Sequence, residues 1–216
     1  MKVLLFQIDG KIPNLALMRI SSHHKVLGDS VEFRRGHSRH LFDDEPDRIY
    51  GSTIFESSTR AVEQLRADYP GAVIGGTGVD ITGSLEDHGI MTQSLDYSLY
   101  PDFKQSIGFT QRGCRLRCSF CVVPRKEGAV RSEQSVFQIW RGAPWPKEVL
   151  LLDNDFFGQL LWRERVAELR DGGFKVSFNQ GINARFLTDE SAEAIASLDY
   201  RDDSMKVKRI YTAWDN

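Results

Sequence analysis

Three cysteines stand within eight consecutive positions of this sequence, at Cys114, Cys118 and Cys121, and the 216 residues contain no others. Thiolates are nucleophiles and ligands for soft metals, so such a cluster calls for a chemical explanation. A disulfide would leave one thiol unpaired. A structural zinc site needs four ligands, and the nearest histidine, His88, lies well before the cysteines, so folding would have to supply the fourth. Three thiolates can instead hold an iron–sulfur cubane at three corners and leave its fourth iron open.

The cysteines follow the spacing CxxxCxxC, the aromatic Phe120 stands directly before the last of them, and a short apolar strand is predicted at residues 106–110. Together these features resemble the radical S-adenosylmethionine (SAM) enzymes, and the resemblance covers about residues 95–216. It implies that Cys114, Cys118 and Cys121 hold a [4Fe-4S] cluster. It also implies that the open iron of this cluster chelates the amino and carboxylate groups of SAM.

The activity that the resemblance implies is reductive cleavage of SAM, by an electron from a donor, to methionine and a 5'-deoxyadenosyl radical that abstracts hydrogen from an unspecified substrate. Two alternatives stay open. One is a non-catalytic iron–sulfur or zinc-stabilised binding module, or cysteines that serve only packing. The other is an RNA-modifying enzyme similar to the radical SAM methylthiotransferases, which also combine an α/β domain with this core. It would need a separate RNA-binding module, and no RNA-binding motif is visible.

Residues 104–131 carry seven basic side chains and one acidic side chain, although the net charge of the whole chain is only −2. Nothing global therefore indicates nucleic acid as a partner. The basic side chains could stabilise thiolates and a reduced cluster, or attract the carboxylate or phosphate of a ligand. They could equally form a solvated basic loop, as most charged runs do.

The first part of the chain predicts an open α/β sheet. Residues 3–9 form a continuous apolar run of strand length, which is typical of a strand buried on both faces, and further strands are predicted at 30–34, 47–55 and 72–78 with helices between them. The layout resembles the Rossmann-like cobalamin-binding domain of several radical SAM proteins. The DxHxxG cobalt-ligating motif is absent, so we expect little or no cobalamin binding and a structural or substrate-covering role. Glycines at 75, 76 and 78 could cradle a phosphate or a flat cofactor.

The second part predicts a partial (β/α) barrel of the radical SAM type, after a turn-rich linker at 83–102. We place the two domains at residues 1–95 and 96–216. Barrel strands are predicted at 106–110, 149–153, 174–178 and 209–213, and such barrels carry their chemistry at the carboxyl ends of the strands. The polar residues there could bind the ammonium, carboxylate and ribose groups of SAM. The expected contacts are Asp153, Asp155, Asn179 and Gln180, with Asn154, Asn183, Arg185, Asp215 and Asn216 nearby.

The four predicted β/α units fall short of the six that the resemblance implies, and the sequence ends at Asn216. We therefore expect a partial reading frame with low turnover and an open barrel edge through which copies could associate. The chain has no secretory signal and no apolar run of membrane-spanning length, and 41% of its residues are hydrophobic and 27% charged. These features predict a cytoplasmic protein.

Overall fold

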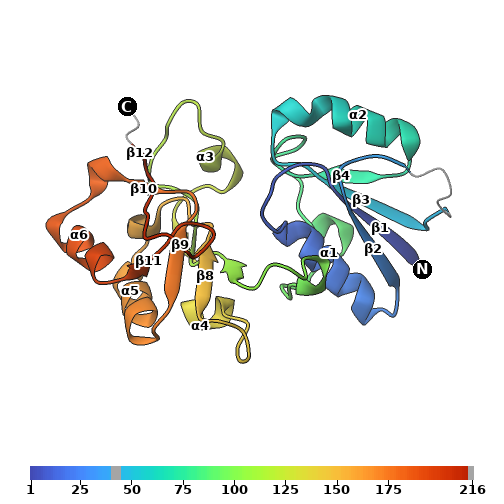
Figure 1. The fold of residues 1–216 in the computed structure, drawn as a ribbon. Helices are drawn as coiled ribbons and strands as arrows, with labels where there is room; N and C mark the ends of the chain where they lie inside the picture. The colour runs from blue at the N-terminus through green and yellow to red at the C-terminus, as the bar shows by residue number, and fades with distance from the viewer. Residues whose placement is uncertain (40–44, 214–216) are drawn as a thin grey trace. The chain divides into compact units, whose positions relative to one another are not determined.

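The structure is a computed structural model that describes residues 1–39 and 45–213. The chain divides into two compact units, Met1–Phe103 and Lys104–Asn216 (Figure 1). Both units are built on parallel strands, which confirms an α/β fold. None of the helices within the described ranges has the length and apolar character needed to cross a membrane.

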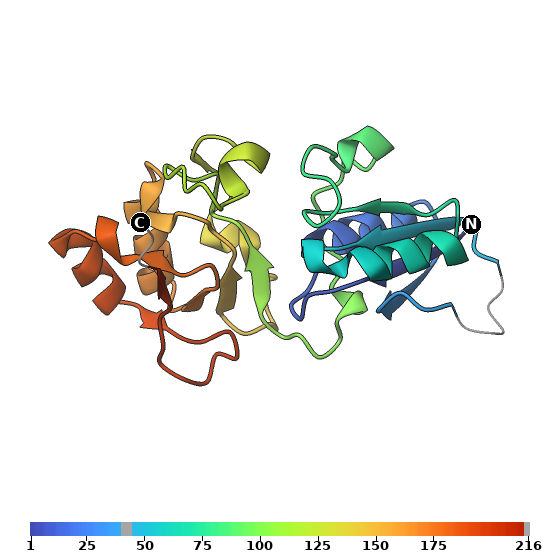
Figure 2. The same cartoon turned by 90° about the horizontal axis from the view of Figure 1, so that it is seen from above.

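The first unit is a four-stranded parallel sheet in the order β2-β1-β3-β4. Its strands are β1 (Lys2–Gln7), β2 (Ser30–Arg35), β3 (Arg48–Ser52) and β4 (Val73–Gly75). Helices α1 (Leu15–Val26) and α2 (Thr59–Asp68) lie on opposite faces of this sheet (Figure 2). Val3 and Leu5 pack with side chains of α1. Leu4 and Phe6 pack with side chains of α2, so the alternating residues of β1 are buried on both faces and the apolar run has its physical explanation.

The segment expected to be a linker packs against the first unit instead. It contains the short 3-10 helices η2 (Glu86–His88) and η3 (Tyr97–Leu99). Tyr100 is buried, and its hydroxyl donates to Gln7 Oε1 at 2.9 Å and accepts from the amide of Asn14 at 3.1 Å. Because Ile90, Leu99 and Tyr100 are buried in the core of the first unit, the division between the units falls after Phe103, eight residues later than expected.

The glycine turn after β4 has a packing role. Gly76 has a φ of +101°, and a Cβ there would overlap the carbonyl oxygen of Thr53. A Cβ on Gly78 would stand 2.6 Å from the carbonyl oxygen of Phe55. The segment that the turn meets is itself held by the carboxylate of Asp9, which accepts hydrogen bonds from the amides at 54 and 55 and from two hydroxyls. A close backbone approach therefore accounts for these glycines without a ligand.

We expect Gly76→Ala to destabilise the first unit by about 2 kcal/mol or more, because the added methyl must displace backbone at a positive φ. Gly75→Ala is the matched control, since a Cβ at Gly75 meets no atom within 4 Å, and it should change stability by less than about 0.5 kcal/mol. Urea unfolding followed by circular dichroism measures both. Equal midpoints for the two variants would contradict the packing role.

The second unit contains a four-stranded parallel sheet in the order β11-β9-β8-β5. Its strands are β5 (Ser106–Gly108), β8 (Glu148–Leu151), β9 (Lys175–Phe178) and β11 (Asp199–Tyr200). Helices α4 (Val136–Ile139), α5 (Trp162–Asp171) and α6 (Asp189–Ala196) accompany it. Val149, Leu151 and Val176 form the centre of one apolar cluster with α4 and α5. This core holds the carboxyl ends of β8 and β9 in place.

Two small two-stranded sheets complete the second unit. β6 (Gln111–Arg112) pairs antiparallel with β7 (Arg131–Ser132), and β10 (Ile182–Asn183) pairs parallel with β12 (Thr212–Ala213). The prediction that residues 209–213 form the fourth barrel strand was wrong. The fourth strand of the main sheet is β11, which follows the buried Leu198, and β12 belongs to a separate sheet. The partial barrel and the Rossmann-like assignment remain predictions.

Candidate functional site

The three cysteines lie on one segment, residues 113–130, which we call the cysteine loop; it leaves β6, contains α3 (Val123–Lys126) and returns through β7. Figure 1 shows it in yellow-green beside β10 and β12. At its base Gly113 has a φ of +77°, and a Cβ there would overlap the carbonyl oxygen of Ala129. The pairing of β6 with β7 and the close approach at Gly113 together close the loop on itself.

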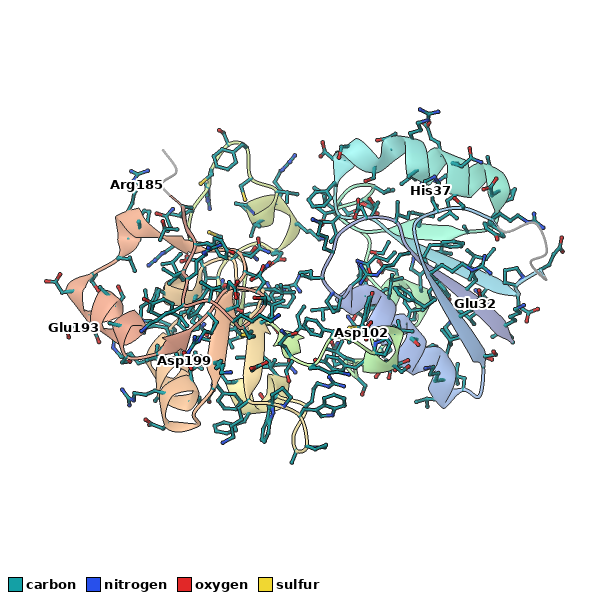
Figure 3. All side chains as sticks on the ribbon, viewed as in Figure 1. Glu32, His37, Asp102, Arg185, Glu193 and Asp199 are labelled. Carbon is teal, nitrogen blue, oxygen red and sulfur yellow. The ribbon has the colours of Figure 1, made fainter. Side chains whose placement is uncertain are left out.

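All three cysteines line one pocket of about 170 Å³ at the carboxyl ends of β8 and β9. Only some of the residues expected at the strand ends line this pocket. Asp155 and Gln180 line it, together with Asn154 and Asn183, and Asp153 and Asn179 do not. Arg185, labelled in Figure 3 at the periphery of this unit, is exposed and outside the pocket lining. Asp215 and Asn216 lie outside the described residues.

Asp153 is buried, and its carboxyl group binds the segment that leads into the cysteine loop. Its side chain accepts hydrogen bonds from the amides of Thr110 at 2.8 Å and Gln111 at 3.2 Å, and from the Thr110 hydroxyl. The residue is only 4% exposed, and burial raises the pKa of its carboxyl to about 7 against the opposing effect of these hydrogen bonds. Both oxygens therefore face the segment that leads into Cys114.

Asp155 joins the end of β8 to the cysteine loop. Its Oδ2 lies 3.0 Å from Nε of Arg115 and accepts the Arg115 amide at 3.2 Å. Burial raises the pKa of Asp155, and the charge of Arg115 opposes that shift. The guanidinium of Arg115 also lies over the ring of Phe186, 5.2 Å from its centroid. The residue after Cys114 is thus held from two sides of the pocket.

Asn179 and Gln180 follow β9 and make different contacts. The Asn179 amide donates to Asp203 Oδ2 at 2.9 Å, and the hydroxyl of Ser177 donates to the other oxygen of Asp203 at 2.6 Å. Gln180 Nε2 donates to Asn179 Oδ1 at 3.0 Å. Asn179 therefore positions Gln180, and Gln180 lines the pocket.

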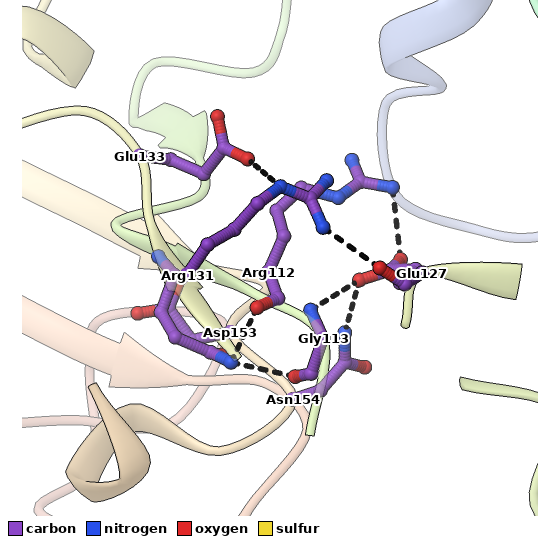
Figure 4. Close-up of polar contacts among 8 residues, drawn as sticks. Arg112, Gly113, Glu127, Arg131, Glu133, Asp153 and Asn154 are labelled. Atoms are coloured by element: carbon purple, nitrogen blue, oxygen red, sulfur yellow. Dashed lines mark hydrogen bonds and ion pairs between the residues drawn. The ribbon is translucent and has the colours of Figure 1, made fainter. Parts of the chain in front are cut away.

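Glu127 is the residue at this site that the sequence reasoning did not single out (Figure 4). Its carboxylate accepts from Arg112 Nη2 at 2.8 Å, from the Gly113 amide at 2.9 Å and from Asn154 Nδ2 at 2.8 Å. Its carbonyl oxygen accepts from Arg131 Nη1 at 2.7 Å. The side chain is 10% exposed. Glu127 therefore fastens both ends of the cysteine loop to the end of β8, and the only available signal was that it is the one acid among the seven basic residues of 104–131.

The donor set of the pocket is three thiols from one loop, which is the number of protein ligands that a cubane with one open iron takes. All three thiols are free and half-buried, and burial raises the pKa of Cys114. Within the described ranges, no three His, Cys, Asp or Glu side chains gather closely enough to hold a single metal ion.

No protein-family model matches this chain, and no curated protein matches it.

Proposed function

We propose that this protein is a radical SAM enzyme, or a part of one, which binds a [4Fe-4S] cluster through Cys114, Cys118 and Cys121. The observation that supports the proposal most is the convergence of three free thiols from one closed loop on a pocket that also holds strand-end polar groups. When bound, the cluster supplies an electron from an external donor and an open iron for the amino and carboxylate groups of SAM.

The residues of this chain would divide the work between binding and positioning. Asp155 and Gln180 line the pocket, where a carboxylate can accept from the ammonium group of SAM and an amide can bind its polar groups. Asp153 and Asn179 act behind them, since their hydrogen bonds go to the segment before Cys114 and to Asp203. Aromatic and aliphatic side chains supply the apolar part of the pocket lining; they include Leu116, Phe120, Phe156, Phe157, Phe186 and Leu187.

Anaerobic reconstitution with iron and sulfide tests this proposal. We expect about four irons per chain, visible charge-transfer absorption and formation of 5'-deoxyadenosine when SAM and a reductant are added. Cys118→Ala should lose the cluster and the product, because it removes one of three ligands. Ser119→Ala, which changes the exposed neighbour in the same loop, should retain both.

Tightly held zinc at one ion per chain, without iron–sulfur absorption, would show instead a zinc-stabilised module. A stable cluster that forms no 5'-deoxyadenosine with SAM and reductant would show a cluster protein without SAM chemistry.

A further inference from the structure

The arginines of the cysteine loop and its base fall into two groups. Three of them are paired with carboxylates: Arg112 with Glu127 at 2.8 Å, Arg115 with Asp155 at 3.0 Å, and Arg131 with Glu133 at 2.8 Å. The first pair closes the base of the loop, the second joins the loop to the segment after β8, and the third is local to β7 and the residue after it. Three of the positive charges that the sequence places here are therefore paired with carboxylates.

Arg117 and Arg125 belong to the second group. Neither guanidinium makes an ion pair or a hydrogen bond with any residue in 1–39 or 45–213. Both are exposed, and both line a second groove of about 660 Å³ on the cysteine loop. The groove adjoins the pocket above and shares Cys114, Arg115, Cys118 and Cys121 with it, but the lining of that pocket includes neither Arg117 nor Arg125.

The lining of the second groove contains three arginines and no carboxylate; its residues are Cys114, Arg115, Arg117, Cys118, Ser119, Cys121, Pro124, Arg125, Gly128, Ala129 and Val130. The nearest acid in sequence, Glu127, is occupied by Arg112, Gly113 and Asn154. The groove is therefore electropositive, and its two unpaired guanidiniums balance two negative charges. Guanidinium forks match the oxygens of phosphate in bidentate geometry.

We propose that this groove binds a small ligand through a doubly charged oxyanion of the phosphate class, held by Arg117 and Arg125 with the Ser119 hydroxyl as a further donor. The site goes beyond the proposed function and does not depend on it, because neither arginine nor the serine is a thiol ligand. The competing role for the two arginines is to neutralise thiolates or a bound cluster. If the two arginines served only that role, the metal-free protein would not bind free anions.

Titration of the metal-free, reduced full chain with inorganic phosphate at constant ionic strength, followed by isothermal calorimetry and ³¹P nuclear magnetic resonance, tests the proposal. We expect saturable binding that weakens at least tenfold in Arg117→Ala and in Arg125→Ala. Arg170→Ala is the matched control, since Arg170 is an exposed arginine on α5 outside the groove, and it should bind as the unchanged protein does.

Thermal unfolding confirms that each variant is folded, and Arg125→Lys, which keeps the charge and loses the fork, should show an intermediate affinity. Absence of saturable phosphate binding by the metal-free protein would overturn the proposal. Equal loss of binding in Arg170→Ala, or equally tight binding of succinate at the same ionic strength, would overturn the assigned site or the phosphate class respectively. Failure of the protein to assemble iron bears only on the proposed function.

Discussion

Glu127→Gln is expected to open the base of the cysteine loop. Three donors point at the Glu127 carboxylate, from Arg112, Gly113 and Asn154. A glutamine amide has one acceptor oxygen, so its NH₂ group must face at least one of these donors, and Arg112 loses its charge partner. Removing one member of a largely buried charge network costs several kcal/mol. We expect the free energy of local opening of the cysteine loop to fall by about 2 kcal/mol.

Hydrogen exchange measures this opening directly. The Gly113 amide donates to Glu127, and its exchange should become roughly 30-fold faster in Glu127→Gln, as about 2 kcal/mol implies. The control is Glu133→Gln, which breaks the more exposed pair with Arg131 and should change exchange at Gly113 by less than about threefold. If Gly113 keeps its full protection in Glu127→Gln, the carboxylate does not fasten the loop.

Asp153→Asn is expected to change how stability depends on pH. Burial raises the pKa of Asp153 from its ordinary value of 3.8 to about 7 in the folded chain. Between these values the folded state binds more protons than the unfolded state, so stability falls as pH rises. The contribution of the protonated carboxyl is therefore fully present below about pH 4 and is lost above about pH 7. The slope is at most about 1.4 kcal/mol per pH unit.

The asparagine amide carries no ionisable proton, and its oxygen can still accept from the amides of Thr110 and Gln111. The variant should therefore lack this fall in stability. Between pH 4 and pH 8 the unfolding free energy of the unchanged chain should fall by on the order of 2 to 4 kcal/mol more than that of the variant. Urea unfolding at a series of pH values gives both curves. Asp171→Asn, at an exposed residue of α5, should follow the unchanged protein. Parallel curves for Asp153→Asn and the unchanged chain would show that Asp153 is ionised throughout.

Patterns local to the chain were sufficient to predict parallel sheets and a single short segment that carries all three cysteines. The apolar run of β1 indicated burial on both faces, because strand residues alternate between faces and both must be apolar when both are covered. The cysteine spacing likewise lies within one short segment, so it can be read without knowing the fold. The end of β9 at Phe178 followed from the same apolar pattern, whereas β8 ends at Leu151, two residues before the predicted end.

The tertiary structure alone decided which polar residues face the pocket. Asp153 and Asp155 are two positions apart and have the same side chain, yet the first braces Thr110 from a buried position and the second lines the pocket with Arg115. Composition and spacing do not distinguish them, because the direction of each side chain depends on how the backbone turns after β8. Glu127 meets partners 15 and 27 residues away. Those contacts exist only after β6 pairs with β7 and the loop closes against the core.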